Sequence, residues 1–118
     1  MIVGTIRILP PRNRRADVLG ILLSVQGPIR ARPGCCACDI YEEQGPEQAV
    51  VLIERFESQE ALQAHVRSEA YRRILGAVEL SGARPDIRFE QVSASEGLEL
   101  IERHRLVAGA QNGKGDKS

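Results

Sequence analysis

The residue types best suited to chemistry are a histidine and a tyrosine in the segment from 50 to 80. Leu62, His65 and Val66 follow a helical spacing that Tyr71 and Ile74 continue, so both polar side chains fall on an apolar helix face. There His65 could act as a general base on a phenol or enol, and Tyr71 could donate to a substrate oxyanion. A buried histidine with one satisfied nitrogen and a core tyrosine fit the same positions. Both interpretations stay open.

Three cysteines lie close together at Cys35, Cys36 and Cys38. On a strand, Cys36 and Cys38 would share one face, about 6.6 to 7 Å apart, with Cys35 on the other. A structural zinc site needs four ligands, and the sequence has no second Cys/His pair at ligand spacing. We therefore expect no metal. Small buried side chains are the expected role, and a redox-sensing thiol is the alternative.

Two arginines, Arg7 and Arg88, belong to segments that we expect to form neighbouring strands. Either could bind a substrate carboxylate or enolate, and either could instead pair with Glu54, Glu90 or another surface acid. The sequence has no Gly-rich phosphate loop and no dinucleotide-binding fingerprint.

The elements that position these residues follow from periodicity and from turn residues. Alternation and β-branched residues predict strands at 1–9, 35–42, 49–56 and 86–92. Helical spacing predicts a helix over 13–32, kinked at Gly27-Pro28, and a second helix that begins after the N-cap Ser58. Ser68 can cap a new start, so this second helix should bend near Arg67. The order βαββαβ is that of an α+β ferredoxin-like plait.

Composition limits the classes of function. The 118 residues carry no net charge, which argues against a nucleic-acid partner. No apolar run approaches the roughly 20 residues needed to cross a bilayer, and nothing indicates export. Clustered cysteines in an odd number favour a reducing cytoplasm. We expect a domain at 1–94, an appendage at 95–108 that is a short helix or a strand, and a disordered tail at 109–118.

The predicted sheet is apolar on both faces. Val50, Leu52 and Phe56 alternate with Val51 and Ile53 in the third strand, and the first strand shows a similar pattern. Two helices can cover only one face of a four-stranded antiparallel sheet. Because a large exposed apolar patch is rare on a soluble monomer, we expect a homodimer in which two sheets pack face to face.

The segments PGCCACDIYEE and VVLIERFESQEALQAHVRSEAYRRIL, with the apolar first strand, resemble the antibiotic biosynthesis monooxygenase (ABM) family of dimeric α+β barrels. The resemblance covers residues 1–92, and GLELIER at 97–103 recurs in some relatives. It implies a cofactor-independent monooxygenase that oxidises a phenol, quinol or anthrone with O2. A non-catalytic small-molecule-binding module and an isomerase acting through an enolate are the alternatives.

The resemblance also places the family's functional positions on this chain. The triad of the haem-degrading branch falls on Ile6, His65 and Leu75, and none of the three matches, so haem is not expected. In the cofactor-free branch, an aromatic at the end of the third strand matches Phe56, and a helical tyrosine matches Tyr71. We therefore expect His65 and Tyr71 as catalytic residues and no cofactor. The expected substrate-binding residues are Phe56, Ile6, Cys38 and Arg88.

Overall fold

The computed structural model describes the backbone of residues 1–111. The four strands are β1 (Ile2–Ile8), β2 (Cys35–Glu42), β3 (Val50–Phe56) and β4 (Asp86–Gln91). They form one antiparallel sheet in the order β2-β3-β1-β4. The helices are a 3₁₀ turn η1 (Arg12–Arg14), α1 (Arg15–Arg30), α2 (Gln59–Val66), α3 (Glu69–Val78) and α4 (Leu98–Gln111). Up to β4 this is the predicted ferredoxin-like α+β fold.

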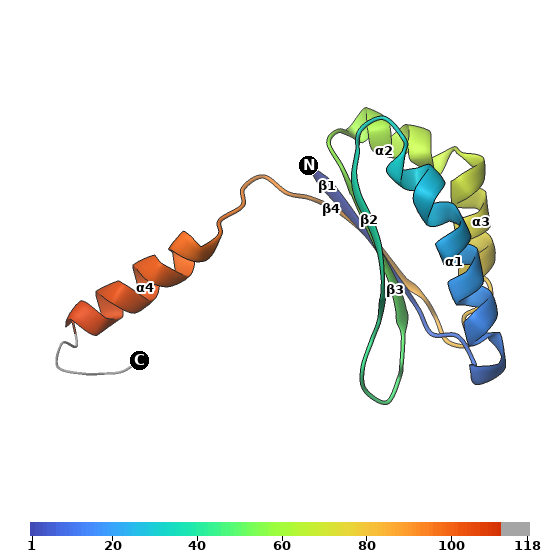
Figure 1. Ribbon diagram of the computed structural model, residues 1–118, viewed down its shortest axis with the longest axis horizontal. Helices are drawn as coiled ribbons and strands as arrows, with labels where there is room; N and C mark the ends of the chain where they lie inside the picture. Colours follow the sequence, from blue (N-terminus) through green and yellow to red (C-terminus); the bar gives the residue numbers. More distant parts are fainter. Residues whose placement is uncertain (112–118) are drawn as a thin grey trace.

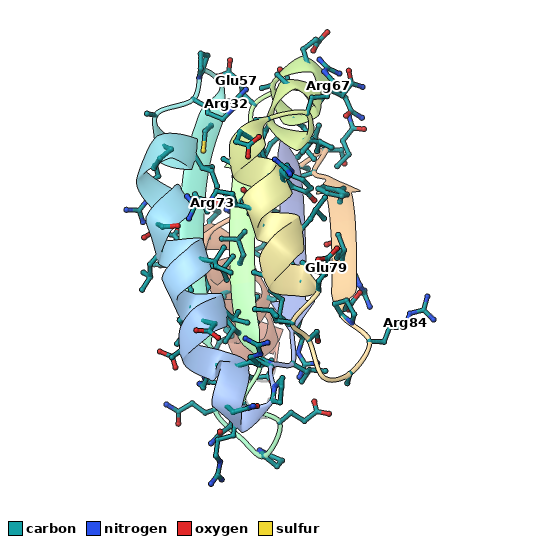
Figure 2. The ribbon with its side chains drawn as sticks, turned by 90° about the vertical axis from the view of Figure 1, so that its right-hand side faces the viewer. Arg32, Glu57, Arg67, Arg73, Glu79 and Arg84 are labelled. Carbon is teal, nitrogen blue, oxygen red and sulfur yellow. The ribbon has the colours of Figure 1, made fainter. Side chains whose placement is uncertain are left out.

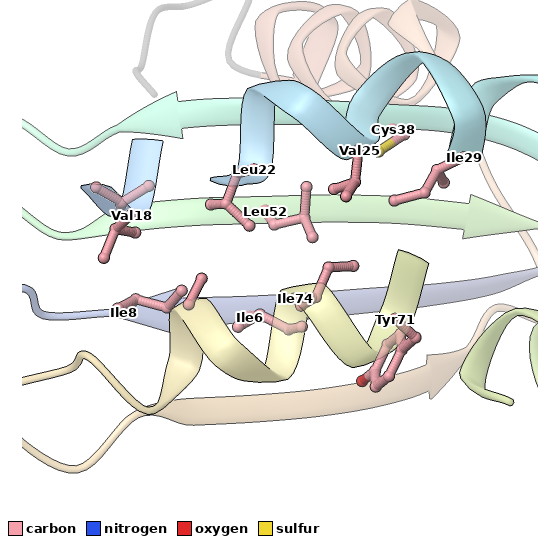
Figure 3. Close-up of a cluster of buried hydrophobic side chains, with 12 residues drawn as sticks. Ile6, Ile8, Val18, Leu22, Val25, Ile29, Cys38, Leu52, Tyr71 and Ile74 are labelled. Atoms are coloured by element: carbon pink, nitrogen blue, oxygen red, sulfur yellow. The ribbon is translucent and has the colours of Figure 1, made fainter. Parts of the chain in front are cut away.

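One face of the sheet carries the core (Figure 3). Alternate residues of β1 and β3 are buried against α1 and α3, which present the apolar stripes that the sequence predicts. Pro28 is accommodated in the last turn of α1, which continues to Arg30. The main cluster consists of Ile6, Ile8, Val18, Leu22, Val25, Ile29, Cys38, Val50, Leu52, Tyr71, Ile74 and Ala77.

The predicted bend near Arg67 is a complete break between α2 and α3. Ser58 caps α2 by accepting from the backbone N–H of Ala61 at 3.2 Å. Ser68 caps α3 by accepting from the N–H of Tyr71 at 3.2 Å, and its hydroxyl donates to the carbonyl oxygen of His65 at 2.6 Å. One serine therefore ties together the backbones of both candidate catalytic residues.

Strand β2 contains a bulge that changes which cysteines share a face. The register against β3 shifts between Cys35 and Ala37, because Cys35 is opposite Phe56 while Ala37 is opposite Arg55. Cys35 consequently packs beside the core with Cys38, and Cys36 is exposed. The predicted grouping of Cys36 with Cys38 is wrong, because strict alternation holds only in a strand without an inserted residue.

The helical layer does not extend over the whole sheet. Figure 2 shows α1 and α3 in front of β2, β3 and β1, with β4 uncovered at the edge. All six residues of β4 are exposed. No helix among the described residues packs on the far face of the sheet. This face includes the half-buried side chains of Val3, Val51 and Ile53.

Helix α4 projects away from the domain on the side opposite α1 to α3 (Figure 1). Of the two readings of the appendage, a helix is the one found, and it continues to Gln111, past the predicted boundary at 108. The rest of the predicted disordered tail, 112–118, lies outside the described residues. Within 1–111, no helix is long and apolar enough to cross a membrane.

Candidate functional site

The site centres on a buried pair formed by His65 of α2 and Glu54 of β3. The imidazole Nε2 lies 2.6 Å from the carboxylate Oε2 of Glu54. His65 is 0% exposed and Glu54 is 1% exposed, although both are polar. Residues this polar are rarely buried in full unless they are paired, so each side chain accounts for the burial of the other.

Two aromatic rings enclose the imidazole of His65. Phe56 stacks on it with ring centroids 5.0 Å apart, and Tyr71 meets it edge-on at 5.2 Å and 89°. Figure 3 shows the ring of Tyr71 projecting from α3 at one end of the core. Burial raises the pKa of the Tyr71 hydroxyl, and the charge of Glu54 raises it further. Tyr71 is therefore held as a neutral phenol, which can donate a hydrogen bond.

The second ring nitrogen of His65, Nδ1, is not engaged in a hydrogen bond within the described part of the chain. Nδ1 is buried and has no hydrogen-bond partner among the described residues. An ionised carboxylate only accepts hydrogen bonds, so when Glu54 is ionised Nε2 of His65 is the donor in this contact. In the neutral imidazole this leaves a lone pair on Nδ1, inside a site that excludes water. A base fixed in one tautomer by a carboxylate is a recurring arrangement in general-base catalysis.

Most of the residues predicted for the site do come together. Cys38 lies directly opposite Glu54 in the β2–β3 register, and Phe56 lies two residues beyond Glu54 on the same face. Ile6 is on the same helix-covered face, in the neighbouring strand β1, and is buried. Tyr71 contacts His65 directly.

The two predicted arginines are not part of this group. Arg88 is opposite Thr5 in the register, on the far face of the sheet, and it bonds to Asp86 at 3.2 Å. Arg7 binds Glu43 through two hydrogen bonds, at 2.6 and 2.9 Å, and binds Glu47 at 2.7 Å. Arg7 lowers the pKa of Glu43 by hydrogen bonding to it.

Glu54 is the residue that sequence reasoning missed. We expected it to be a surface acid available to an arginine, but it faces the helices and its partner is His65. The sequence did contain a signal for this. In the alternating strand β3, Glu54 falls on the same face as Val50, Leu52 and Phe56. An acid on the covered face of a strand requires a buried partner, and His65 is the polar residue on the apolar face of the helix that follows.

The cysteines add no ligand cluster to the site. Within residues 1–111, no group of three or more His, Cys, Asp or Glu side chains is placed to hold a metal ion. Desolvation, together with the smaller effects of the Glu54 and Cys35 charges, raises the pKa of the Cys38 thiol to about 12. Cys38 is thus a neutral, inert wall of the site at physiological pH.

Comparison with known proteins identifies the family. The sequence profile described as "Antibiotic biosynthesis monooxygenase" matches residues 1–77. The chain belongs to the ABM family.

Several solved structures share the fold of this chain. Rv0793 from Mycobacterium tuberculosis is 26% identical, with a TM-score of 0.72 over 81% of this chain and 98% of that protein. PA3566 from Pseudomonas aeruginosa is 19% identical, with a TM-score of 0.67 over 79% and 94% of the two chains. A structure described as an antibiotic biosynthesis monooxygenase is 18% identical, with a TM-score of 0.69 over 80% and 100%. No curated protein matches the chain significantly.

Proposed function

We propose that this ABM protein is a cofactor-independent monooxygenase that oxidises a small phenolic, quinol or anthrone-like molecule with O2. The observation that carries the proposal is the buried pair of His65 and Glu54, with Nδ1 of His65 unpartnered between two aromatic rings. Membership of the family supports a monooxygenase in general terms. The substrate class is our inference from the arrangement of base and rings.

In the proposed reaction, Nδ1 of His65 removes the acidic proton of the substrate. Glu54 accepts the hydrogen bond from Nε2 and stabilises the imidazolium that forms. The Tyr71 hydroxyl donates to the substrate oxyanion. The resulting electron-rich anion passes an electron to O2, and the two radicals combine at carbon. For an anthrone, the methylene carbon becomes a carbonyl, one oxygen atom enters the product, and the other leaves as water.

The test is oxygen uptake with a panel of 1,4-naphthohydroquinone and anthrones, comparing wild type with His65→Ala and Glu54→Gln. We expect His65→Ala to lose at least a hundredfold in rate, because general-base catalysis contributes roughly 10² to 10⁴. The matched control is His104→Ala, which removes the only other histidine, an exposed residue of α4. Wild-type rates no higher than the uncatalysed oxidation would refute the proposal.

The two alternatives predict different outcomes in the same assay. An isomerase acting through an enolate would turn over its substrate equally well without oxygen. A non-catalytic binding module would bind members of the panel, and neither wild type nor His65→Ala would consume oxygen above the uncatalysed rate.

We also infer that the protein works as a homodimer in the cytoplasm. The half-buried apolar residues Val3, Val51 and Ile53 lie on the sheet face that α1 to α3 leave open, and α4 extends on that same side (Figure 1). A second copy packed sheet to sheet would cover this face. Free thiols at Cys35, Cys36 and Cys38 support a reducing compartment. Sedimentation equilibrium at micromolar concentration should give twice the 13.0 kDa chain mass.

A further inference from the structure

A row of residues crosses the sheet from the buried pair to the uncovered edge. Glu54 of β3 is opposite Gly4 of β1, and Gly4 is opposite Phe89 of β4. Residues opposite each other in neighbouring strands point to the same face. The row therefore consists of a carboxylate, a residue without a side chain, and an aromatic ring, all on the face that bears the helices.

The ring of Phe89 packs directly on Gly4. A Cβ atom placed on Gly4 would lie 3.1 Å from Cε1 of Phe89 and 3.9 Å from Oε1 of Glu54. The ring of Phe89 thus fills the space above Gly4, with the Glu54 carboxylate beside it. Any larger residue at position 4 would occupy this space.

Phe89 is also the exposed end of this row. It points to the helix side of the sheet, but it is 44% exposed because the helical layer stops short of β4 (Figure 2). His65 and Glu54, by contrast, are buried. A substrate can reach Nδ1 of His65 only if some side chain moves aside. Among the residues of this row, Phe89 is exposed, whereas Glu54 and Gly4 are buried, so Phe89 is the side chain that can turn outward into solvent.

We propose that Phe89 is the gate of the site and that the space above Gly4 receives the substrate ring. This inference rests on the proposed function, and it names the access route and the residues that select by size. The ring of Phe89 turns outward, a flat aromatic molecule enters from the β4 edge over Gly4, and its hydroxyl reaches the His65–Glu54 pair.

The experiment measures binding without turnover. 2-Naphthol is mixed with protein under nitrogen in a stopped-flow instrument, and its emission is followed to obtain the association rate and the affinity. The 15N–1H signals of the His65 ring report where it binds, with His104→Gln used to assign the only other histidine. Thermal melts confirm that each variant folds.

Two variants and one control separate the gate from general loosening of the edge. Phe89→Ala should raise the association rate at least fivefold, and Gly4→Ala should weaken binding at least tenfold. Ile87→Ala is the control, because Ile87 lies on the same strand and face at 38% exposure but is opposite Ile6. It should change both quantities less than twofold.

Equal rates in Phe89→Ala and Ile87→Ala, or wild-type affinity in Gly4→Ala, would overturn the gate. The same holds if millimolar 2-naphthol leaves the His65 signals of the wild type unmoved. Oxygen uptake is judged separately. If the variants change binding as expected but the protein consumes no oxygen, the monooxygenase is refuted and the gate stands. If the protein consumes oxygen but the variants do not change binding, the gate is refuted and the monooxygenase stands.

Discussion

Among individual residues, the most important contact is the one between His65 and Glu54. Both side chains are removed from water, so each depends on the other for its hydrogen bond at 2.6 Å. Such a pair need not add net stability over an apolar pair, but breaking it leaves a buried polar group unsatisfied. The chemical role proposed above would account for such a pair in the core of a small domain.

This dependence can be measured by a double-mutant cycle in urea. His65→Phe leaves the Glu54 carboxylate buried and unpaired, and should reduce the free energy of unfolding by about 3 to 5 kcal/mol. Glu54→Leu leaves the imidazole donor without an acceptor and should cost about 1 to 3 kcal/mol. The double variant should recover most of the loss. Simple additivity of the two single effects would contradict this account.

The three cysteines should differ in reactivity because they differ in burial. Cys36 is exposed, while Cys38 is fully buried with a pKa raised to about 12. At pH 8, iodoacetamide should therefore modify Cys36 first and leave Cys38 unmodified until the protein unfolds. Peptide mass spectrometry would show the order. Early modification of Cys38 in the folded protein would contradict the placement.

The same raised pKa has a consequence at alkaline pH. The unfolded chain loses the Cys38 proton near its usual pKa of 9.0, whereas the folded chain holds it to about 12. The unfolded state thus binds fewer protons in this window, so stability falls as pH rises from 9 towards 12. Cys38→Ala should flatten this part of the profile of unfolding free energy against pH.

At the scale of elements, the break between α2 and α3 sets the geometry of the site. A continuous helix would keep His65 and Tyr71 in a single helical register, whereas Ser68 restarts the helix so that Tyr71 meets the imidazole edge-on. Gly34 is equally important at the other end of α2. It adopts a φ of +82°, and a Cβ there would lie 2.5 Å from the Cβ of Ala61.

Two glycine substitutions should act in opposite directions. Gly34→Ala forces a left-handed residue and a clash with α2, and we expect it to destabilise the protein by more than about 1 kcal/mol. Gly76→Ala, within α3 and with no atom from outside its own helical turn within 4 Å of the added Cβ, should stabilise it by about 0.5 to 1 kcal/mol. Thermal melts would compare the pair. A gain from Gly34→Ala would show that the backbone there is not constrained as described.

At the scale of the whole molecule, the open face of the sheet and the projecting α4 raise the same question. An isolated helix of 14 residues is marginal in water, and α4 shows exposed Leu98 and Ile101. Both features are accounted for if the functional unit contains two chains.

A charge placed at the centre of the open face tests this arrangement. Ile53→Asp should shift the sedimenting species from dimer to monomer, because an unpaired carboxylate would be buried between the sheets. Leu23→Asp is the control, since Leu23 is an exposed apolar residue of α1, on the helical side. A wild-type protein that sediments as a monomer would remove the basis for the dimer.

The sequence by itself determined the order of the elements, the two serine caps and the side of its helix on which His65 lies. These depend on local periodicity and on hydrogen bonds between near neighbours, which a linear pattern contains. The tertiary structure alone decided that Glu54 pairs with His65 and that Arg88 faces away from them. It also decided that a bulge places Cys35, and not Cys36, beside the core with Cys38, and that Phe89 covers Gly4. Each of these depends on strand register and on where the helical layer ends, and both are set by packing between segments far apart in the chain.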